Sequence, residues 1–342
     1  MNILEVGLER IKNLYRVRRT STHVSQEIVL IPTYRCNCFC TYCFAKEAGA
    51  RCMEDMSLKK LKTLFLWFKR SRIRSILLSG GEPTLYLHFK ELLELVRFYK
   101  MRCGIASNNL FPEKTRTLFS RSTTPFFLLH FNPESFAKDQ GDLFRDNLRS
   151  LKATGSYVGL QVIVHKRMLD RSAIALAKET QCDVWLTTAC PGPSNGNIVP
   201  PEELLALGAV VVDFVRECKT KKIKTVFSRP VIPCMYTAGQ LSGLMPSAVR
   251  YQCVPVPVVN PDCSVTTCVN IFSGGEDIFT YKDNKDLKAS LYSRFKVLQQ
   301  RPLFPHCPQC TFYIRNKCQG GCLAYKEYRA APCNEDNTCR FS

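Results

Sequence analysis

The sequence predicts an α/β protein whose parallel sheet curls into a partial (β/α)6 barrel, followed by a cysteine-rich C-terminal domain. Strand-like and helix-like segments alternate over the first two thirds of the chain, as they do in parallel sheets joined by crossover helices. Right-handed crossovers curl such a sheet in one direction. Three cysteines follow the first predicted strand, at the edge of the sheet where barrels place their chemistry.

The predicted strands are short runs of apolar residues, and the segments between them repeat apolar residues at helical spacing. On the first helix, for example, Leu61, Leu64, Phe65 and Phe68 share one face. The strands are expected at 27–32, 75–79, 102–107, 126–131, 157–165 and 183–188, and the helices at 57–72, 87–100, 112–122, 143–153, 169–181 and 201–221.

The composition indicates a globular protein with room for about two domains. Of the 342 residues, 45% are hydrophobic and 23% are charged, which is ordinary for a globular chain. No apolar run approaches the roughly 20 residues that cross a bilayer, so no membrane insertion is expected. Residues 1–25 repeat Leu4, Leu8, Ile11 and Tyr15 at helical spacing, which predicts an amphipathic helix and not a signal peptide.

The cysteine content and the charge bear on the compartment and the partners. Nineteen cysteines without an export signal predict a cytoplasmic protein whose thiols bind metal, because the cytosol keeps thiols reduced. The formal net charge is +19, and residues 10–19 and 59–74 carry much of it. A basic surface suits an acidic peptide, a nucleic acid or a phosphorylated substrate, or it is only a solvated face.

Cys36, Cys40 and Cys43 stand at C-x3-C-x2-C spacing directly after the first predicted strand. This spacing lets one loop turn three thiolates toward a common centre, and thiolates hold iron-sulfur clusters. Three ligands on a four-iron cluster leave one iron open to bind another molecule. The alternatives are a zinc loop or reduced structural thiols, but zinc sites usually pair their cysteines as C-x2-C with a second pair elsewhere.

The segment 35–43, with Tyr42 before its last cysteine, resembles the cluster loop of the radical S-adenosylmethionine (SAM) enzymes. The resemblance implies that Cys36, Cys40 and Cys43 hold a [4Fe-4S] cluster whose open iron binds SAM. In that family an electron from the cluster cleaves SAM to a 5'-deoxyadenosyl radical. Tyr42 would contact the adenine, and the alternative for its ring is a plain core position.

The loop after the second strand reads Gly80-Gly81-Glu82-Pro83 and matches the Gly-Gly-Glu-Pro motif of that family, which binds the methionine amino group of SAM. Two glycines allow a close backbone approach to a ligand, and the proline fixes the exit of the loop. The four residues are therefore candidate SAM contacts.

Three further loops at the same edge carry candidates. Ser107 and Asn108, after the third strand, resemble the family's Thr-Asn-Gly and are implied contacts to the carboxylate or ribose of SAM. His130 and His165 end the fourth and fifth strands, where they touch cofactor or substrate or serve as local hydrogen-bonding groups. Cys190, after the sixth strand, is a candidate hydrogen-atom donor to a substrate radical, with a structural thiol as the alternative.

From about residue 230 the sequence changes to prolines, short apolar pieces and cysteines. Their spacing resembles the SPASM extension of radical SAM enzymes, although Cys263 stands where that pattern has glycine and the gap between Cys310 and Cys318 is two residues longer than usual. The resemblance implies two auxiliary [4Fe-4S] clusters. The first would be held by Cys253, Cys268 and Cys322 with Cys234 as fourth ligand, and the second by Cys307, Cys310 and Cys318 with Cys339 or, as second choice, Cys333.

The expected organisation is an N-terminal helix (1–25), a radical SAM barrel (26–229) and an auxiliary-cluster domain (230–342). A zinc ribbon at 307, 310, 318 and 322 is the alternative for the last part, but a single zinc would leave four other cysteines without a role.

The resemblance implies an enzyme that abstracts hydrogen from a substrate carbon with an adenosyl radical. The predicted substrate is a ribosomally made precursor peptide that is crosslinked, epimerised or oxidised, and the alternative is a small molecule such as an aminoglycoside. A nucleic-acid-binding zinc protein and a ferredoxin-like carrier leave the Gly-Gly-Glu-Pro loop unexplained. Expected partners are an external electron donor of the flavodoxin or ferredoxin type and a separate peptide-recognition protein, because the roughly 25 residues before the first strand are too few for a folded recognition domain.

Overall fold

Parallel strands run through one sheet in the order in which they occur in the chain. The computed structural model describes residues 28–46, 54–137, 139–164, 169–189, 203, 206–237, 239–240, 251–271 and 275–330. Its parallel strands are β1 (Ile28–Leu30), β2 (Ser75–Leu78), β3 (Arg102–Ser107), β4 (Phe126–His130), β5 (Tyr157–Val164), β6 (Asp183–Thr188) and β7 (Thr225–Phe227). Each of these strands pairs in parallel with the next.

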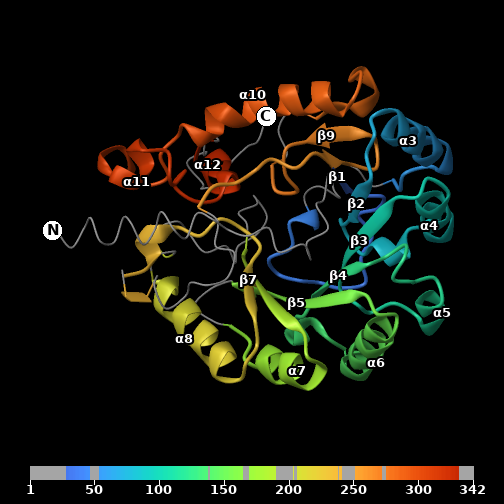
Figure 1. The fold of residues 1–342 in the computed structure, drawn as a ribbon, viewed down its shortest axis with the longest axis horizontal. Coiled ribbons are helices and arrows are strands. Elements are labelled where there is room, and N and C mark those ends of the chain that lie inside the picture. Colours follow the sequence, from blue (N-terminus) through green and yellow to red (C-terminus); the bar gives the residue numbers. More distant parts are fainter. Residues whose placement is uncertain are drawn as a thin grey trace.

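Because the strand order never reverses, right-handed crossovers place the connecting helices on one face of the sheet. The helices are α3 (Leu58–Arg70), α4 (Phe89–Phe98), α5 (Glu113–Arg116), α6 (Gln140–Ala153), α7 (Ser172–Thr180) and α8 (Leu207–Thr220). They follow one another around the outer arc of the molecule, with the strands inside (Figure 1). This is the arrangement that the predicted partial barrel requires, and the predicted α/β class with a parallel sheet is confirmed.

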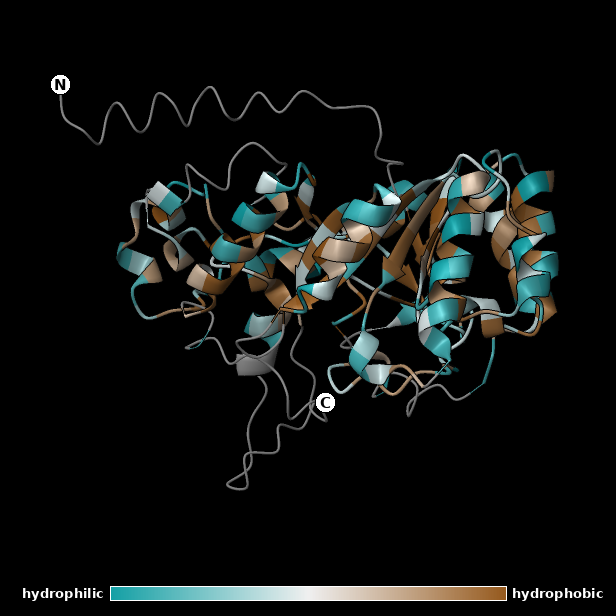
Figure 2. Ribbon diagram, turned by 90° about the horizontal axis from the view of Figure 1, so that it is seen from below, coloured by the Kyte–Doolittle hydropathy of each residue, from teal (hydrophilic) through white to brown (hydrophobic). Residues whose placement is uncertain are grey.

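Apolar residues fill the layer between the sheet and these helices, which are hydrophilic on their outer sides (Figure 2). Helix α3 shows how the sequence produces this layer. Its N-cap Ser57 accepts a hydrogen bond from the backbone N–H of Lys60, which satisfies one of the free donors of the first turn. The helix buries Leu61, Leu64 and Phe68 against the sheet.

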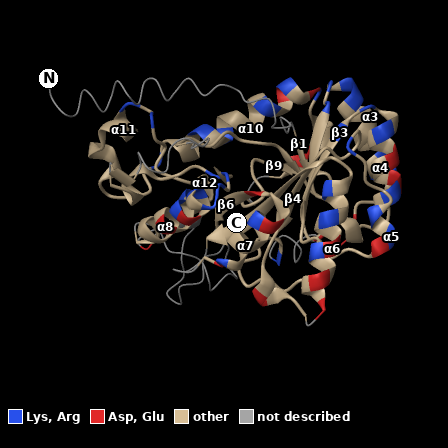
Figure 3. Cartoon of the chain, turned by 60° about the horizontal axis from the view of Figure 1, so that its bottom comes forward, with Lys and Arg blue, Asp and Glu red and all other residues tan. Residues whose placement is uncertain are grey.

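The outer face of α3 and of the turn that follows it is strongly basic. Lysines and arginines gather on this helix (Figure 3). The exposed basic residues here are Lys59, Lys60, Lys62, Lys69, Arg70, Arg72 and Arg74. The first turn of α3 holds no acidic residue. This stretch of the predicted basic surface therefore lies open to solvent.

The C-terminal third extends the same sheet beyond β1. Strand β8 (Val258–Val259) pairs in parallel with β1, and β9 (Ser264–Thr266) and β10 (Glu276–Asp277) follow in antiparallel order. Helices α10 (Asn284–Gln299), α11 (Thr311–Ile314) and α12 (Leu323–Ala330) lie across the molecule from α6 and α7 (Figure 1). The cysteine-rich region is thus joined to the strand that precedes the cluster loop.

The strand predictions agree with the structure within two residues, whereas two helices are shorter than predicted. The helix predicted at 201–221 begins only at Leu207, and the one predicted at 112–122 is reduced to about one turn. Residues 112–122 were expected to be helical, but α5 ends at Arg116. Beyond it Ser120 accepts bonds from the backbone N–H groups of Thr123 and Thr124 in a tight turn, and Pro125 keeps Thr124 out of helical geometry. The predicted helix at 1–25 lies outside the described residues. None of the helices described is both long and apolar enough to span a bilayer.

Candidate functional site

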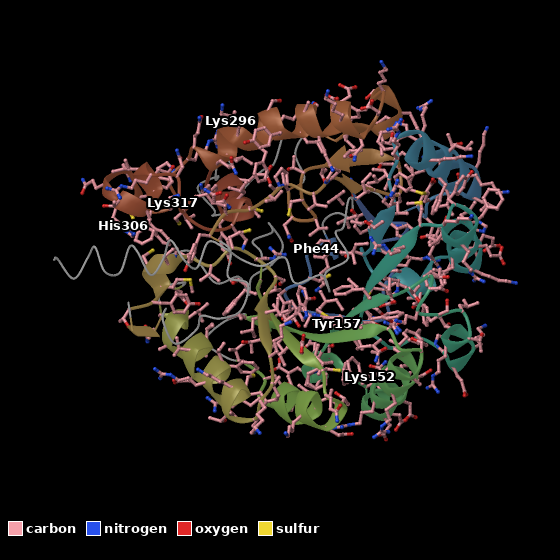
Figure 4. All side chains as sticks on the ribbon, viewed as in Figure 1. Phe44, Lys152, Tyr157, Lys296, His306 and Lys317 are labelled. Carbon is pink, nitrogen blue, oxygen red and sulfur yellow. The ribbon has the colours of Figure 1, made fainter. Side chains whose placement is uncertain are left out.

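The three predicted cluster cysteines lie on one loop after β1, at the carboxyl edge of the sheet. Figure 4 places Phe44, which directly follows Cys43, near the centre of the molecule between the parallel strands and the C-terminal segments. The backbone N–H of Cys43 donates to the carbonyl of Cys40 at 3.3 Å, which turns the end of the loop back on itself. The prediction that these cysteines share a loop at the sheet edge agrees with the structure.

Two asparagines from neighbouring strands point at the sulfurs of this loop. Asn108 follows β3, and its Nδ2 lies 3.7 Å from Sγ of Cys36 and 3.3 Å from Sγ of Cys38. Asn132 follows β4, and its Nδ2 lies 3.6 Å from Sγ of Cys40. Amide donors near thiolate sulfurs are among the features that set the potential of an iron-sulfur cluster. Asn132 was not predicted as a site residue, although it directly follows the predicted strand 126–131.

The thiols of the loop differ in acidity. A hydrogen bond from Cys38 is the largest cause that lowers the pKa of Cys36 to about 7. Burial raises the pKa of Cys43 to about 11 and also raises the pKa of Cys40. Cys36 is therefore the thiol that loses its proton most easily, and iron displaces the protons of the others when it binds.

The start of the loop is fixed by an ion pair. Nη2 of Arg35 lies 2.5 Å from Oδ2 of Asp55, and its Nε lies 3.1 Å from Oδ1. Thr33 donates to the same carboxylate at 2.5 Å. Partial burial opposes ionisation of Asp55, but the bonds from Arg35 and Thr33 outweigh it and lower the pKa of Asp55. Asp55 thereby holds the backbone before Cys36 through the side chains of Thr33 and Arg35.

Gly80 and Gly81 bring the loop after β2 into contact with the backbone of the cluster loop. Gly81 N–H donates to the carbonyl of Thr33 at 3.1 Å, and Glu82 N–H donates to the carbonyl of Arg35 at 2.8 Å. A Cβ atom on Gly81 would stand 2.2 Å from the carbonyl oxygen of Arg35, and one on Gly80, whose φ is +124°, would stand 2.6 Å from that of Thr33. Glycine is required at both positions because any side chain would push the two loops apart.

Glu82 is buried and bonds to two other predicted SAM contacts, Ser107 and Asn108. Both of its carboxylate oxygens lie 3.0 Å from the hydroxyl of Ser107, and one accepts the backbone N–H of Asn108 at 2.7 Å. Thr84 donates its backbone N–H and its hydroxyl to the other. Burial raises the pKa of Glu82 even though these bonds oppose the shift. Glu82 thus holds the β2 and β3 loops in register, and Pro83 starts the turn that leads away from them.

Tyr42 contacts His130, the predicted candidate at the end of β4. The Tyr42 hydroxyl and Nε2 of His130 are 2.9 Å apart, and the two rings meet edge to face. The bond links the cluster loop to the fourth strand. His165 and Cys190 lie outside the described residues.

In the C-terminal third, the cysteines predicted for the first auxiliary site come together. Cys253, Cys268 and Cys322 pack against one small apolar cluster built around Ile271 and Phe295. Arg229, which follows β7, contacts Cys322, with Nη1 3.9 Å from Sγ. Cys263, in the place of the expected glycine, is buried with φ +78°, a value that favours glycine.

Cys234 groups differently from the prediction. It was assigned to the first auxiliary site, but its thiol interacts electrostatically with Cys307, Cys310 and Cys318 of the second. Its neighbour Ile232 lies against the glycine pair 320–321, which in turn lies beside Cys307. The short turn Pro233–Met235 therefore brings Cys234 toward the second group, because it packs against the segment that carries those cysteines. Cys333 and Cys339 lie outside the described residues.

A cavity opens at the carboxyl ends of β5, β6 and β7. Thr187, Thr188 and Arg229 supply polar groups to its wall, and Tyr236 and Tyr325 close it from the C-terminal side. The remaining wall is largely apolar. This cavity was not predicted from the sequence. Strand β7 was not predicted, and Arg229 was therefore not recognised as a residue that follows a strand. Cavities of this kind, apolar with a few polar groups, are typical small-ligand and side-chain sites.

No three His, Cys, Asp or Glu side chains in the described part of the chain converge on a position for a single metal ion. Within the cluster loop, the amide of Asn108 contacts Cys36 and that of Asn132 contacts Cys40. Thiolates with such donors fit an iron-sulfur cluster, and three of them would leave one iron of a four-iron cluster unligated.

The Radical SAM superfamily model matches residues 30–158, which span β1 to the start of β5 and include the cluster loop. This part of the chain is similar to the Radical SAM superfamily. Its fold agrees with this match, because SuiB of Streptococcus suis bound to S-adenosylmethionine superposes with a TM-score of 0.61 at 13% identity, covering 95% of this chain and 77% of that one.

Two further proteins are similar over most of the chain. The mycofactocin maturase MftC of Mycobacterium tuberculosis is 22% identical over 326 residues, which cover 88% of this chain and 78% of MftC. The native structure of anSMEcpe with bound AdoMet has a TM-score of 0.64 at 17% identity and covers 91% of this chain and 92% of that one. The radical SAM fold is therefore shared along both the parallel sheet and the C-terminal third.

Proposed function

We propose that this protein is a radical SAM enzyme that modifies a ribosomally made peptide. The observation that carries the proposal is the meeting of Cys36, Cys40 and Cys43 with the donors Asn108 and Asn132 on the loops that follow β1, β3 and β4. The match to the superfamily model covers the same loops.

Cys36, Cys40 and Cys43 would hold a [4Fe-4S] cluster, which supplies the electron that splits bound SAM into methionine and a 5'-deoxyadenosyl radical. The residues of the chain position the cofactor. Gly80 and Gly81 let the β2 loop pack against the backbone of the cluster loop, beside which the methionine end would bind, and Glu82 keeps Ser107 and Asn108 in place. Tyr42, which is bonded to His130, would contact the adenine.

The sheet would also protect the reaction. A primary carbon radical attacks whatever C–H bond is nearest, so the target carbon has to be held close while water is excluded. The cavity at the ends of β5, β6 and β7 lies on the same edge of the sheet as the cluster loop and has largely apolar walls. It is the candidate site for the target side chain. Cys190 stands two residues after the end of β6 in the sequence and remains a predicted hydrogen-atom donor.

Three relatives support a peptide substrate. MftC is named as a maturase, SuiB has been crystallised with its precursor peptide SuiA, and anSMEcpe has been crystallised with a peptide called Cp18Cys. The basic face of α3 would favour an acidic peptide or an acidic electron donor. A small-molecule substrate remains the second candidate.

The two groups of C-terminal cysteines would hold two auxiliary [4Fe-4S] clusters. Cys253, Cys268 and Cys322 form one group, and Cys307, Cys310 and Cys318 form the other with Cys234 beside them. Cys339 stays a predicted ligand of one of these sites. An external electron donor of the flavodoxin or ferredoxin type, a separate peptide-recognition protein and a cytoplasmic location also remain predictions.

The test is an anaerobic reaction of reconstituted protein with SAM, a reductant and a precursor peptide encoded beside its gene. Peptide maturation predicts 5'-deoxyadenosine together with a peptide whose mass has changed by hydrogen loss or whose residue has been epimerised. The small-molecule substrate would be favoured if the peptide stays unmodified while a small molecule made by the products of the neighbouring genes is modified. Zinc without iron or acid-labile sulfide would remove the enzyme interpretation.

A further inference from the structure

Two cations, Arg229 and Lys326, lie near Cys322, and the proposed function leaves them without a role. Arg229 comes from the loop after β7, and Lys326 lies in α12, four residues after Cys322 and so on the same side of the helix. Cys322 itself directly precedes α12, whose N-terminal end adds partial positive charge. The thiol of Cys322 thus has the Arg229 guanidinium in contact, the N-terminal end of α12 next to it and Lys326 one helical turn further along.

The Arg229 guanidinium is partly buried at the wall of the cavity. With the Asn270 amide oriented to satisfy both groups, its oxygen accepts from Nη2 of Arg229 at 2.7 Å and from Nη1 at 3.2 Å. Nη1 also lies 3.9 Å from Sγ of Cys322, and Cys268 interacts with the same charge. Arginine cannot be deprotonated in a protein, so this charge is permanent.

Lys326 is more deeply enclosed, with only 2% of its surface exposed. Its Nζ donates to the carbonyl of Gln299 at 3.1 Å and to that of Gln319, and it lies 5.8 Å from the centre of the Tyr313 ring. The thiols of Cys307, Cys318 and Cys322 are its electrostatic neighbours. Carbonyls and a ring solvate the ammonium but do not neutralise it.

Neither cation forms an ion pair with a carboxylate of the residues that the structure describes. A buried charge is retained in proteins when an opposite charge or a metal centre compensates it. The groups near Arg229 and Lys326 that can carry negative charge are the thiols of the auxiliary sites. Neutral thiols would leave two positive charges without compensation, whereas thiolates bound to iron would balance them.

We propose that Arg229 and Lys326 are positioning charges that raise the reduction potential of the auxiliary centre containing Cys322. The inference rests on the auxiliary clusters of the proposed function. A nearby positive charge stabilises the form of the centre that carries one more electron, and net charge and bonds to the sulfurs are the main protein influences on such potentials. The two charges bias the centre toward accepting an electron over donating one.

The test measures the midpoint potential of the auxiliary centre by redox titration followed with electron paramagnetic resonance. The full chain carries C36A, C40A and C43A, which removes the signal of the SAM cluster, and the signal that disappears on adding C268A identifies the centre. The variants are R229Q, K326Q, the charge-conserving R229K and the control K296Q. Lys296 lies exposed on α10 (Figure 4), so K296Q removes a charge that is screened by solvent.

At the midpoint potential of the parent chain, we expect the ratio of reduced to oxidised centre to fall about tenfold in R229Q and in K326Q. For one electron this corresponds to about 59 mV toward more negative potential. R229K and K296Q should stay near the parent ratio. The proposal is overturned if R229Q loads iron fully and keeps the parent potential, if K296Q shifts it as much, or if the site holds zinc.

Where R229Q does not incorporate iron, K326Q decides alone, since a lowered potential upholds the proposal and an unchanged one overturns it. The measurement does not depend on SAM cleavage, which the triple cysteine variant has lost. Formation of 5'-deoxyadenosine by the unsubstituted protein reports separately on the proposed function, so the two failures are distinguishable.

Discussion

Both carboxylate oxygens of Glu82 lie 3.0 Å from the hydroxyl oxygen of Ser107, so a single buried acid connects the loops that follow β2 and β3. These are the loops that carry the predicted SAM contacts. Their spacing depends on a group that does not need to touch the cofactor. Glu82 therefore acts on the site through Ser107 and Asn108, and its substitution should affect stability and cofactor binding together.

Glu82→Gln should destabilise the fold in a way that depends on pH. Thr84 donates a backbone N–H to one carboxylate oxygen and Asn108 donates one to the other. Whichever way the glutamine amide turns, its NH2 group faces a backbone N–H and leaves it unsatisfied, at a cost of about 1–3 kcal/mol.

The sign of the pH effect follows from the raised pKa of Glu82. The folded protein holds this proton more tightly than the unfolded chain, so the stabilisation is complete below the ordinary glutamate pKa of about 4.3 and is lost as the pH rises through the folded value. The stability gap between wild type and E82Q should therefore narrow with rising pH. Urea unfolding of the apoproteins across this range measures it, and a gap that widens would contradict the raised pKa.

Gly81→Ala should separate the β2 loop from the cluster loop. The new Cβ would stand 2.2 Å from the carbonyl oxygen of Arg35, and backbone cannot move aside as a flexible side chain can. We expect a loss of about 1–3 kcal/mol from overpacking and a marked loss of SAM binding. Thermal unfolding and equilibrium binding measure the two effects.

Gly141→Ala is the matched control. Gly141 lies in the first turn of α6, and a Cβ there would meet nothing within 4 Å. Alanine is a better helix former than glycine by about 1 kcal/mol, so stability should stay equal or rise slightly. SAM binding by G81A equal to that by G141A would show that close contact of the two loops is not needed.

The ligand set of the SAM cluster can be tested against a cysteine in the same loop. Combined replacement of Cys36, Cys40 and Cys43 by alanine should lower the iron content by about four atoms per chain and abolish 5'-deoxyadenosine formation. Cys38 lies outside the C-x3-C-x2-C spacing although its thiol is beside Cys36, so C38A should keep its iron. Iron analysis and the spectrum of the reduced cluster provide the readout. Loss of four irons in C38A would mean that the ligands are wrongly assigned.

Tyr42→Phe removes the 2.9 Å bond to His130 and keeps the ring. A hydrogen bond of this kind contributes about 0.5–1.5 kcal/mol, so SAM should bind about two- to tenfold more weakly. Because the two side chains act as a pair, H130A should add little to the effect in the double variant. Binding losses that simply add would show that Tyr42 and His130 act on the cofactor separately.

The parts of the fold with strong local patterns were predictable from the sequence. Strands β3 and β6 occur at the predicted residues, because each is a short apolar run bounded by turn residues. Strands β7 and β8 were not predicted. They are two or three residues long, and β8 exists through its pairing with β1, a partner more than 220 residues away that no local pattern reveals.

The candidate site divides in the same way. The cluster loop and the Gly-Gly-Glu-Pro loop were recognised because the functional residues of each loop are close together in the sequence. Asn132 and Arg229 were missed because each gains its meaning from a sulfur about 90 residues away in the chain. Cys234 was grouped by spacing, which says nothing of how the turn that carries it packs against the second set of cysteines.

The most direct test of the account is the cleavage of SAM by the anaerobically reconstituted protein in the presence of dithionite. The account predicts 5'-deoxyadenosine and methionine in equal amounts from the unsubstituted chain and neither from the variant without Cys36, Cys40 and Cys43. A preparation with its full iron content that forms no 5'-deoxyadenosine would contradict the central claim.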